Sequence, residues 1–202
     1  DYGSGNILSA QQSFIKVSKE YNINAEVKIS NDYKDIKNST HLVLPGQGAF
    51  LSCMSGLKNT PGIIDEIYEF AQIKKHPFLG ICVGMQLLAE DSEENGNHKG
   101  LGWINGNIKA LPKKNLKMPH MGWNTAEPCN TVSNNLISQK EDFYFVHSYY
   151  FKCRFRENIL AETLYGITFP SIVVKENIYG VQFHPEKSSS QGLKLIKSFL
   201  TR

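Results

Sequence analysis

The segment that most constrains this chain is residues 78–88, with the sequence FLGICVGMQLL. An apolar run after Pro77 leads into Gly80-x-Cys82-x-Gly84, and a helix-forming segment follows at once. This is the pattern of a nucleophile elbow, a tight strand-to-helix turn that presents its central side chain at the apex. Side chains at the two glycines would collide with the crossing backbone. A buried structural cysteine is the alternative, but the flanking glycines favour Cys82 as a nucleophile whose thiolate a helix N-terminus stabilises.

Composition limits the class of protein further. The 202 residues are 41% hydrophobic, which is enough for one core, and we expect a single domain over residues 1–202. The net charge of +3 comes with no basic run, which argues against nucleic acid as a partner. Four cysteines without a CxxC pair indicate reduced thiols of a cytoplasmic protein. We expect no signal peptide, and the sequence has no apolar run that could cross a membrane.

The first half of the chain alternates between strand and helix patterns. Asn6 can cap a helix with an apolar stripe up to Tyr21. Residues 24–29 and 41–44 have strand patterns, and Pro61 sits where a helix can begin. Together with the elbow, this order predicts an α/β fold with an open, mostly parallel sheet flanked by helices. Residues 1–6 look like the loop after a first strand, so we expect that a few N-terminal residues, including that strand, are missing.

The second half of the chain has a different sequence pattern. Short apolar stretches alternate with Gly, Asn and Pro and predict an antiparallel extension of the sheet. They lie at residues 104–111, 118–123, 143–149, 171–175 and 178–183. Glu176-Asn177 is a hairpin connection in this reading. Ser188 and Gln191 have the spacing of a capping box for a last helix.

A cysteine nucleophile needs a base, and His184 is the best candidate among six histidines. It follows the apolar strand that ends at Phe183, and the carboxyl ends of strands in an open α/β sheet meet at one rim, where Cys82 also lies. Glu186 is two residues away and can hold the imidazole ring. His147 is the rival base. The other histidines considered, at positions 41, 76 and 98, lie in polar or loop contexts that indicate surface residues.

Gly46-Gln47-Gly48 follows a short apolar strand and is rich enough in glycine to approach the elbow closely. Its backbone N–H groups and that of Val83 could form an oxyanion hole; the alternative is a simple turn. The sequence does not contain metal-ligand spacing or a complete phosphate-binding fingerprint, so we expect neither a metal nor a cofactor.

Several motifs together resemble a known family. Residues 45–48 (PGQG), 80–86 (GICVGMQ) and 183–186 (FHPE) are similar to the three signatures of class I glutamine amidotransferases. Residues 119–124 (PHMGWN), 144–149 (YFVHSY) and 182–189 (QFHPEKSS) narrow the resemblance to glutaminase subunits of imidazole glycerol phosphate synthase. The resemblance covers essentially the whole chain and implies a flavodoxin-like fold.

The resemblance also implies site residues and a partner. Cys82, His184 and Glu186 would form the catalytic triad, and Gly46, Gln47, Gly48 and Val83 the oxyanion hole. Four positions match residues that hold glutamine in the family, namely Gln86, Glu94, Ser148 and Tyr149. A cyclase subunit with a (β/α)₈ barrel would receive the ammonia. The residues expected to face it are His120, Met121, Trp123, Asn124, Tyr144 and Lys187, although Met121 and Trp123 also fit a role within this domain alone.

Two other functions remain open at this point. The chain could be a paralogous glutaminase that supplies ammonia to another synthase, for example for sugar amidation. It could also be a scaffold without activity that binds a barrel partner, although an intact Cys82, His184 and Glu186 argue against this. A papain-like protease is disfavoured because Cys82 follows a strand and lacks the local sequence of that family.

Overall fold

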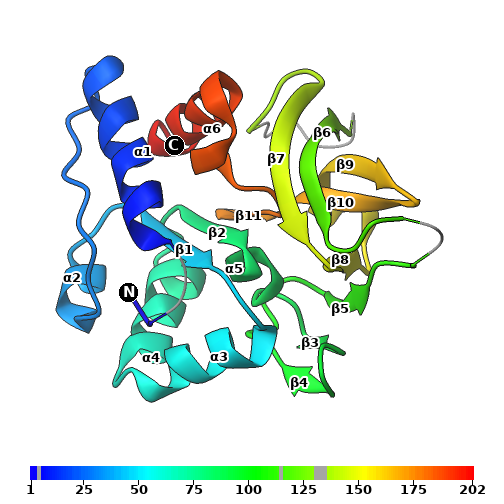
Figure 1. Ribbon diagram of the computed structural model, residues 1–202. Helices are drawn as coiled ribbons and strands as arrows, with labels where there is room; N and C mark the ends of the chain where they lie inside the picture. Colours follow the sequence, from blue (N-terminus) through cyan, green and yellow to red (C-terminus); the bar gives the residue numbers. More distant parts are fainter. Residues whose placement is uncertain (4–5, 114–115, 130–135) are drawn as a thin grey trace.

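The computed structural model describes residues 1–3, 6–113, 116–129 and 136–202 (Figure 1). A seven-stranded sheet runs through the molecule in the order β1-β2-β11-β10-β9-β6-β7. Its strands are β1 (Leu42–Gly46), β2 (Phe78–Cys82), β11 (Ile178–Val181), β10 (Ile167–Lys175), β9 (Ile159–Tyr165), β6 (His120–Pro128) and β7 (Glu141–His147). A smaller sheet has the order β4-β3-β5-β8. It contains β4 (His98–Lys99), β3 (Asp91–Ser92), β5 (Gly106–Ala110) and β8 (Tyr149–Cys153).

The prediction of a mostly parallel sheet was wrong. In the seven-stranded sheet the two parallel pairs are β1 with β2 and β2 with β11, and the remaining pairs are antiparallel. The reason is the short connections in the second half, because a tight hairpin can join only antiparallel strands. The predicted hairpin at Glu176-Asn177 is confirmed, with Lys175 opposite Ile178. The antiparallel extension is therefore the larger part of the sheet.

Helices cover the parallel end of the sheet. In Figure 1, α1 (Ile7–Glu20) and α6 (Ser189–Leu200) lie on one side of β1 and β2, while α3 (Phe50–Asn59) and α4 (Ile63–Tyr68) lie on the other. The remaining helices are α2 (Tyr33–Lys37) and the single turn α5 (Val83–Gln86), with a π-helical segment at Glu69–Ile73 and 3₁₀ turns at Arg156–Asn158 and Pro185–Lys187. No helix among the described residues is both long and apolar enough to cross a membrane.

Local signals at the helix ends had mixed outcomes. Asn6 caps α1 as predicted, since its Oδ1 accepts a hydrogen bond from the Ser9 amide at 3.4 Å. The predicted capping box at Ser188 is wrong, because the Ser188 hydroxyl makes no bond to the α6 backbone. Pro61 does not open a helix either. It precedes Gly62, whose φ of +73° ends the turn, and α4 begins at Ile63.

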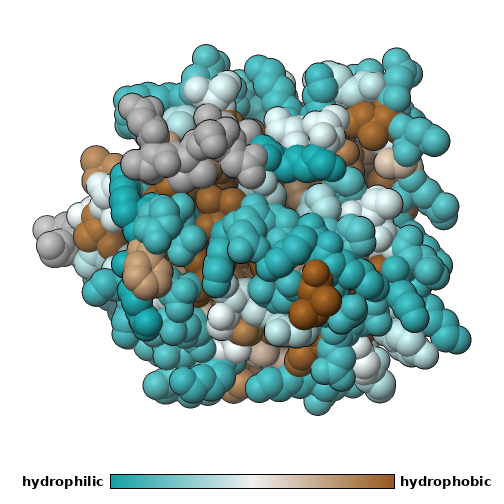
Figure 2. Space-filling view, turned by 180° about the vertical axis from the view of Figure 1, so that it is seen from behind, coloured by the Kyte–Doolittle hydropathy of each residue, from teal (hydrophilic) through white to brown (hydrophobic). Residues whose placement is uncertain are grey.

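The predicted strand at residues 24–29 is also wrong, because this extended segment pairs with no described strand. It is held by side chains instead, such as that of Gln11, whose Nε2 donates to the Val27 carbonyl at 3.1 Å. The core is continuous from α1 to the antiparallel strands and includes large fully buried side chains such as Phe78, Phe145 and Phe183. Figure 2 shows that the face opposite Figure 1 is mostly hydrophilic, with hydrophobic residues in small groups.

Candidate active site

Cys82 lies at the apex of the predicted elbow. It is the last residue of β2, and α5 begins at the next residue, Val83. Its φ of 55° and ψ of −111° fall outside the regions that residues with a side chain prefer, so the backbone is strained here. A Cβ atom on Gly80 would lie 2.6 Å from the Gly84 carbonyl oxygen, and one on Gly84 would collide with the Leu44 carbonyl. The two glycines are therefore required by the turn, as the sequence predicted.

His184 and Glu186 are brought together by a 3₁₀ turn that follows β11. The turn at Pro185–Lys187 folds Glu186 back, so that its Oε1 lies 2.9 Å from Nδ1 of His184. Both side chains are more than nine-tenths buried. Burial opposes the charged ring, but hydrogen bonds from His184 to Cys82 and Glu186 outweigh it and raise the pKa of His184 to about 10. His184 therefore holds a proton at neutral pH while it contacts Cys82 Sγ.

Gln182 is a site residue that the sequence analysis missed. It is fully buried, and its Nε2 lies 3.8 Å from Cys82 Sγ. Its Oε1 accepts a hydrogen bond from Gln86 Nε2 at 3.1 Å, and the same Gln86 nitrogen donates to the Tyr149 carbonyl at 3.1 Å. A polar residue between Val181 and Phe183, in an otherwise apolar stretch, was the signal available in the sequence.

The four expected glutamine-holding residues lie in different environments. Gln86 is buried and adjoins Tyr149 through the bond just described, while Ser148 and Tyr149 are half-buried at the start of β8. Glu94 lies further along the chain, and its Oε2 accepts the Phe50 amide at 2.7 Å at the start of α3. A carboxylate is well placed there, since free N–H groups and the helix dipole both favour negative charge.

The expected oxyanion loop adjoins the elbow directly. Gly46 is the register partner of Cys82 in the parallel β1–β2 ladder. Two side chains hold the loop: the Tyr2 hydroxyl donates to the Pro45 carbonyl at 2.6 Å, and Cys53 Sγ lies 3.6 Å from the Gln47 carbonyl. Gly48 has φ of +99°, a conformation that only glycine adopts without strain. Gly46 therefore lies beside Cys82 in the sheet, and Val83 follows Cys82 directly in the chain.

His147, the rival base, has other partners. Its Nδ1 lies 2.8 Å from the Tyr149 carbonyl and its Nε2 lies 2.9 Å from Nδ1 of His120. Burial is the main cause that lowers the pKa of His147 to about 3, with smaller contributions from the nearby His120 and His184. A histidine with both nitrogens engaged and no tendency to take up a proton is a poor general base.

The expected partner-facing residues divide into exposed and buried groups. Met121 and Trp123 on β6 are 60% and 55% exposed, and Lys187 is exposed as well. Tyr144 is half-buried with its ring 6.1 Å from that of Trp123. His120 belongs to the buried group, because its side chain is only 3% exposed in this chain.

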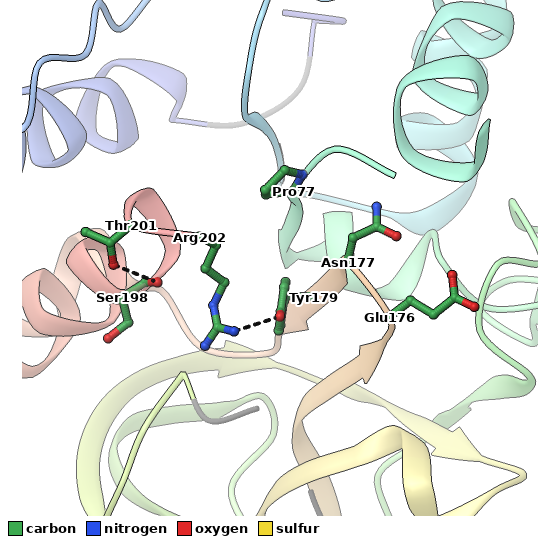
Figure 3. A pocket seen from close by; sticks show the side chains of 7 residues that line it. All are labelled: Pro77, Glu176, Asn177, Tyr179, Ser198, Thr201 and Arg202. Carbon is green, nitrogen blue, oxygen red and sulfur yellow. Dashed lines mark hydrogen bonds between the residues drawn. The ribbon is translucent and has the colours of Figure 1, made fainter. Parts of the chain in front are cut away.

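A surface cavity of about 630 Å³ lies away from these residues (Figure 3). It is lined by Pro77 and Asn177, which precede β2 and β11, and by Tyr179 and Arg202, whose side chains are hydrogen-bonded at 2.9 Å. Cys82 is at the other end of β2, roughly 13 Å from Phe78 along the strand. Across the described residues, no group of three or more His, Cys, Asp or Glu side chains could hold a metal ion.

Comparison with known proteins agrees with this geometry. The profile of the family described as glutamine amidotransferase class-I matches residues 1–202. The chain belongs to this family. It is 42% identical over 205 residues to the imidazole glycerol phosphate synthase subunit HisH of Rhodospirillum rubrum, with 99% of this chain and 95% of that protein covered. It is 46% identical over 203 residues to the subunit HisH 2 of Methanococcus maripaludis, with 99% and 96% covered.

Solved structures show the same fold at lower identity. A crystal structure of a glutamine amidotransferase superposes with a TM-score of 0.73 and 18% identity, covering 98% of this chain and 94% of that one. The glutaminase domain of Trypanosoma brucei CTPS with bound acivicin superposes with a TM-score of 0.67 and 16% identity, covering 96% and 86%.

Proposed function

We propose that this chain is the glutaminase subunit of an imidazole glycerol phosphate synthase and supplies ammonia for histidine biosynthesis. One observation carries the chemistry: Cys82 lies at the strained apex of the elbow in contact with His184, and Glu186 holds that ring at 2.9 Å. This is the arrangement of an activated nucleophile, its base and an orienting group. Full-length similarity to HisH subunits supports the pathway.

In the first half-reaction, Sγ of Cys82 attacks the side-chain amide carbon of glutamine. Negative charge then develops on the amide oxygen, where N–H groups of the Gly46–Gly48 loop and Val83 stabilise it. His184 carries a proton at neutral pH because its pKa is raised to about 10. It gives this proton to the amide nitrogen as the C–N bond breaks, which releases ammonia and leaves a γ-glutamyl thioester on Cys82.

In the second half-reaction, the neutral His184 takes a proton from a water molecule as the water oxygen attacks the thioester carbon. The C–S bond breaks, glutamate leaves, and the thiolate is again beside a protonated imidazole. Glu186 keeps Nδ1 of the ring occupied throughout, so Nε2 is the nitrogen that exchanges protons. Gln86, Ser148, Tyr149 and Glu94 hold the backbone groups of the substrate in this proposal.

The ammonia passes to a cyclase partner with a (β/α)₈ barrel. An exposed Met121 and Trp123 on neighbouring outward positions of β6 support docking there, since a free domain seldom leaves large apolar side chains together in water. Tyr144 and Lys187 flank this strand and the base-bearing turn. The partner thus covers the side of the site from which ammonia leaves.

The experiment is a coupled assay with the cyclase of the same organism. The wild-type complex should make product from glutamine, and the Cys82→Ala complex should make product only from added ammonium. Labelling of Cys82 by a glutamine-mimicking electrophile separates a glutaminase from an inactive scaffold. Production of ammonia without any product from this cyclase would instead indicate a paralogous glutaminase that serves another synthase.

A further inference from the structure

Behind the glutamine site lies a chain of three side chains that the proposed mechanism does not use. It runs from Asn124 on β6 through His120 and His147 to the main-chain carbonyl of Tyr149. The successive distances are 3.1 Å, 2.9 Å and 2.8 Å, all within the range of good hydrogen bonds. His120 and His147 are directly opposite each other in the β6–β7 ladder, which explains why their rings meet.

The direction of every bond in this chain follows from its two ends. The Tyr149 carbonyl can only accept, so Nδ1 of His147 carries the hydrogen. At the other end, the Asn124 amide is oriented by the backbone, because its Oδ1 accepts the Thr125 amide at 2.8 Å and its Nδ2 donates to the Leu164 carbonyl at 3.1 Å. Nδ2 therefore also donates to Nε2 of His120, which must be free of hydrogen.

With both ends fixed, the hydrogen bond between the two rings can have only one donor. A neutral His120 without hydrogen on Nε2 carries it on Nδ1 and donates to Nε2 of His147. Protonating His120 would place an Nε2–H against the Asn124 N–H, so two donors would face each other. Protonating His147 would force His120 to move its hydrogen to Nε2, with the same conflict. Only two neutral rings of one tautomer satisfy all the bonds.

The surroundings favour neutral rings for an independent reason. His120 and His147 are 3% and 6% exposed. The His120 ring stacks on Tyr165 at 3.9 Å and on Phe145 at 4.9 Å, and Phe169 lies 5.0 Å from His147. Burial lowers the pKa of His120 to about 4 and that of His147 to about 3. A charge in this aromatic layer would be costly, so both histidine rings stay neutral around pH 7.

The chain ends at a carbonyl that is part of the site. The Tyr149 oxygen accepts both His147 Nδ1 and Gln86 Nε2, and Gln86 in turn bonds Gln182 beside the Cys82 thiol. We propose that His120 and His147 are positioning residues for glutamine binding, which fix the Tyr149–Gln86 side of the site from strand β6. The proposal rests on the proposed function, because Tyr149 and Gln86 matter for turnover only if glutamine is the substrate.

The first test needs no substitution in the measured protein. Nitrogen-15 NMR of the histidine side chains should show both rings protonated at Nδ1 and bare at Nε2 from pH 6 to 8, with signals assigned from His120→Gln and His147→Asn samples. An imidazolium, or hydrogen on Nε2 of either ring, would overturn the proposal. This readout does not depend on glutaminase activity, so it can fail while the proposed function stands.

The second test compares two substitutions of His147 in the complex with the cyclase. His147→Phe keeps a ring in the aromatic layer but removes the donor to Tyr149. His147→Asn places an amide N–H near the position of Nδ1 and retains it. Loss of one hydrogen bond predicts a KM for glutamine raised about three- to tenfold in His147→Phe, with kcat changed by less than about threefold. His147→Asn should restore KM to within about twofold of wild type.

Thermal unfolding of each variant provides the control for folding. Equal KM values for His147→Phe and wild type, or equally raised values for the Phe and Asn variants, would show that His120 and His147 do not position the site. If the complex of the wild-type chain with the cyclase does not hydrolyse glutamine, the proposed function fails instead.

Discussion

The hydroxyl of Ser188 ties the turn that carries His184 to strand β7. Its Oγ accepts the Tyr144 amide at 3.0 Å and donates to the His184 carbonyl at 2.6 Å. The His184 amide also donates to the Tyr144 carbonyl at 2.9 Å. This arrangement explains why Ser188 does not cap α6: its hydroxyl is occupied on the opposite side. The position of the base is thus set by a strand more than 30 residues earlier in the chain, as well as by β11.

Replacing Ser188 with alanine should loosen this connection. Ser188 is fully buried, and the change leaves the Tyr144 amide without its acceptor, so the free energy of unfolding should fall by about 1–3 kcal/mol. The kcat for glutamine should fall as well, because His184 is less well held. Urea denaturation and the coupled assay measure both effects. Ser190→Ala is the matched control, since Ser190 is exposed and bonds only a neighbouring side chain. Equal stabilities for the two variants would contradict this role.

The strain at Cys82 predicts an unusual order of stability. With φ at 55° and ψ at −111°, glycine suits this position better than alanine, so Cys82→Gly should unfold at higher denaturant than Cys82→Ala. A difference of about 1–3 kcal/mol is expected. At Ser52, an exposed position in α3, the order should be reversed by about 1 kcal/mol because glycine disfavours helices. The same order at both positions would mean that the elbow is relaxed.

The raised pKa of His184 makes part of the stability depend on pH. A folded pKa of about 10, above the ordinary value of 6.5, means that the protonated ring stabilises the fold. This contribution is complete below pH 6.5 and is lost as the pH rises through about 10. Glu186→Gln removes a charge that supports the protonated ring, so its deficit in unfolding free energy should be larger at pH 6 than at pH 9.

Glu176→Gln provides the comparison for that experiment. Glu176 is exposed, and its ion pair with Lys75 lowers the pKa of the carboxyl, so its contribution is lost only in acid. The deficit of this variant should stay level between pH 6 and 9. A level deficit for Glu186→Gln as well would show that the His184–Glu186 pair is not charged in the folded protein.

Trp123 should be important for binding the cyclase. It is 55% exposed on β6, beside an exposed Met121. Truncation of a central interface tryptophan typically costs 2 kcal/mol or more, so Trp123→Ala should weaken the complex by about 30-fold or more. Leu51→Ala is the control, because Leu51 is 46% exposed on α3, away from this strand. Titration calorimetry measures both, and comparable affinities for the two variants would place the interface elsewhere.

How much of the site the sequence could predict depends on the range of the interactions. The elbow and the His184–Glu186 pair were predictable because each is formed within a few residues by a turn. The burial of His120 and the role of Gln182 were not, since they follow from strands that pair across long stretches of chain: β6 with β7, and β11 with β2. The same holds for the sheet. Local hairpins could be predicted, but the proportion of antiparallel strand pairs could not, because it depends on the order of all seven strands.

The last prediction is that the isolated chain hydrolyses glutamine only slowly and that the cyclase with its nucleotide substrate activates it. Uncoupled hydrolysis would waste glutamine, and the oxyanion loop contains a peptide unit that can act as a switch. The peptide after Gln47 has its carbonyl 3.6 Å from Cys53 Sγ, and the φ of +99° at Gly48 lets this unit rotate at little cost. Rotation would exchange a carbonyl and an N–H relative to the developing oxyanion.

Steady-state ammonia release should therefore be measured for the chain alone, for the binary complex, and for the complex with cyclase substrate. One added oxyanion donor is worth about 10²–10³ in rate, so the third rate should exceed the first by at least this factor. Gly48→Ala should reduce the activated rate most, because alanine disfavours a positive φ and restricts the rotation. Tyr2→Phe should have a smaller effect, since it removes one bond to Pro45 and leaves Gly48 free to rotate. Equal rates in all three states would show that the site is already formed in the isolated chain and that the partner does not control it.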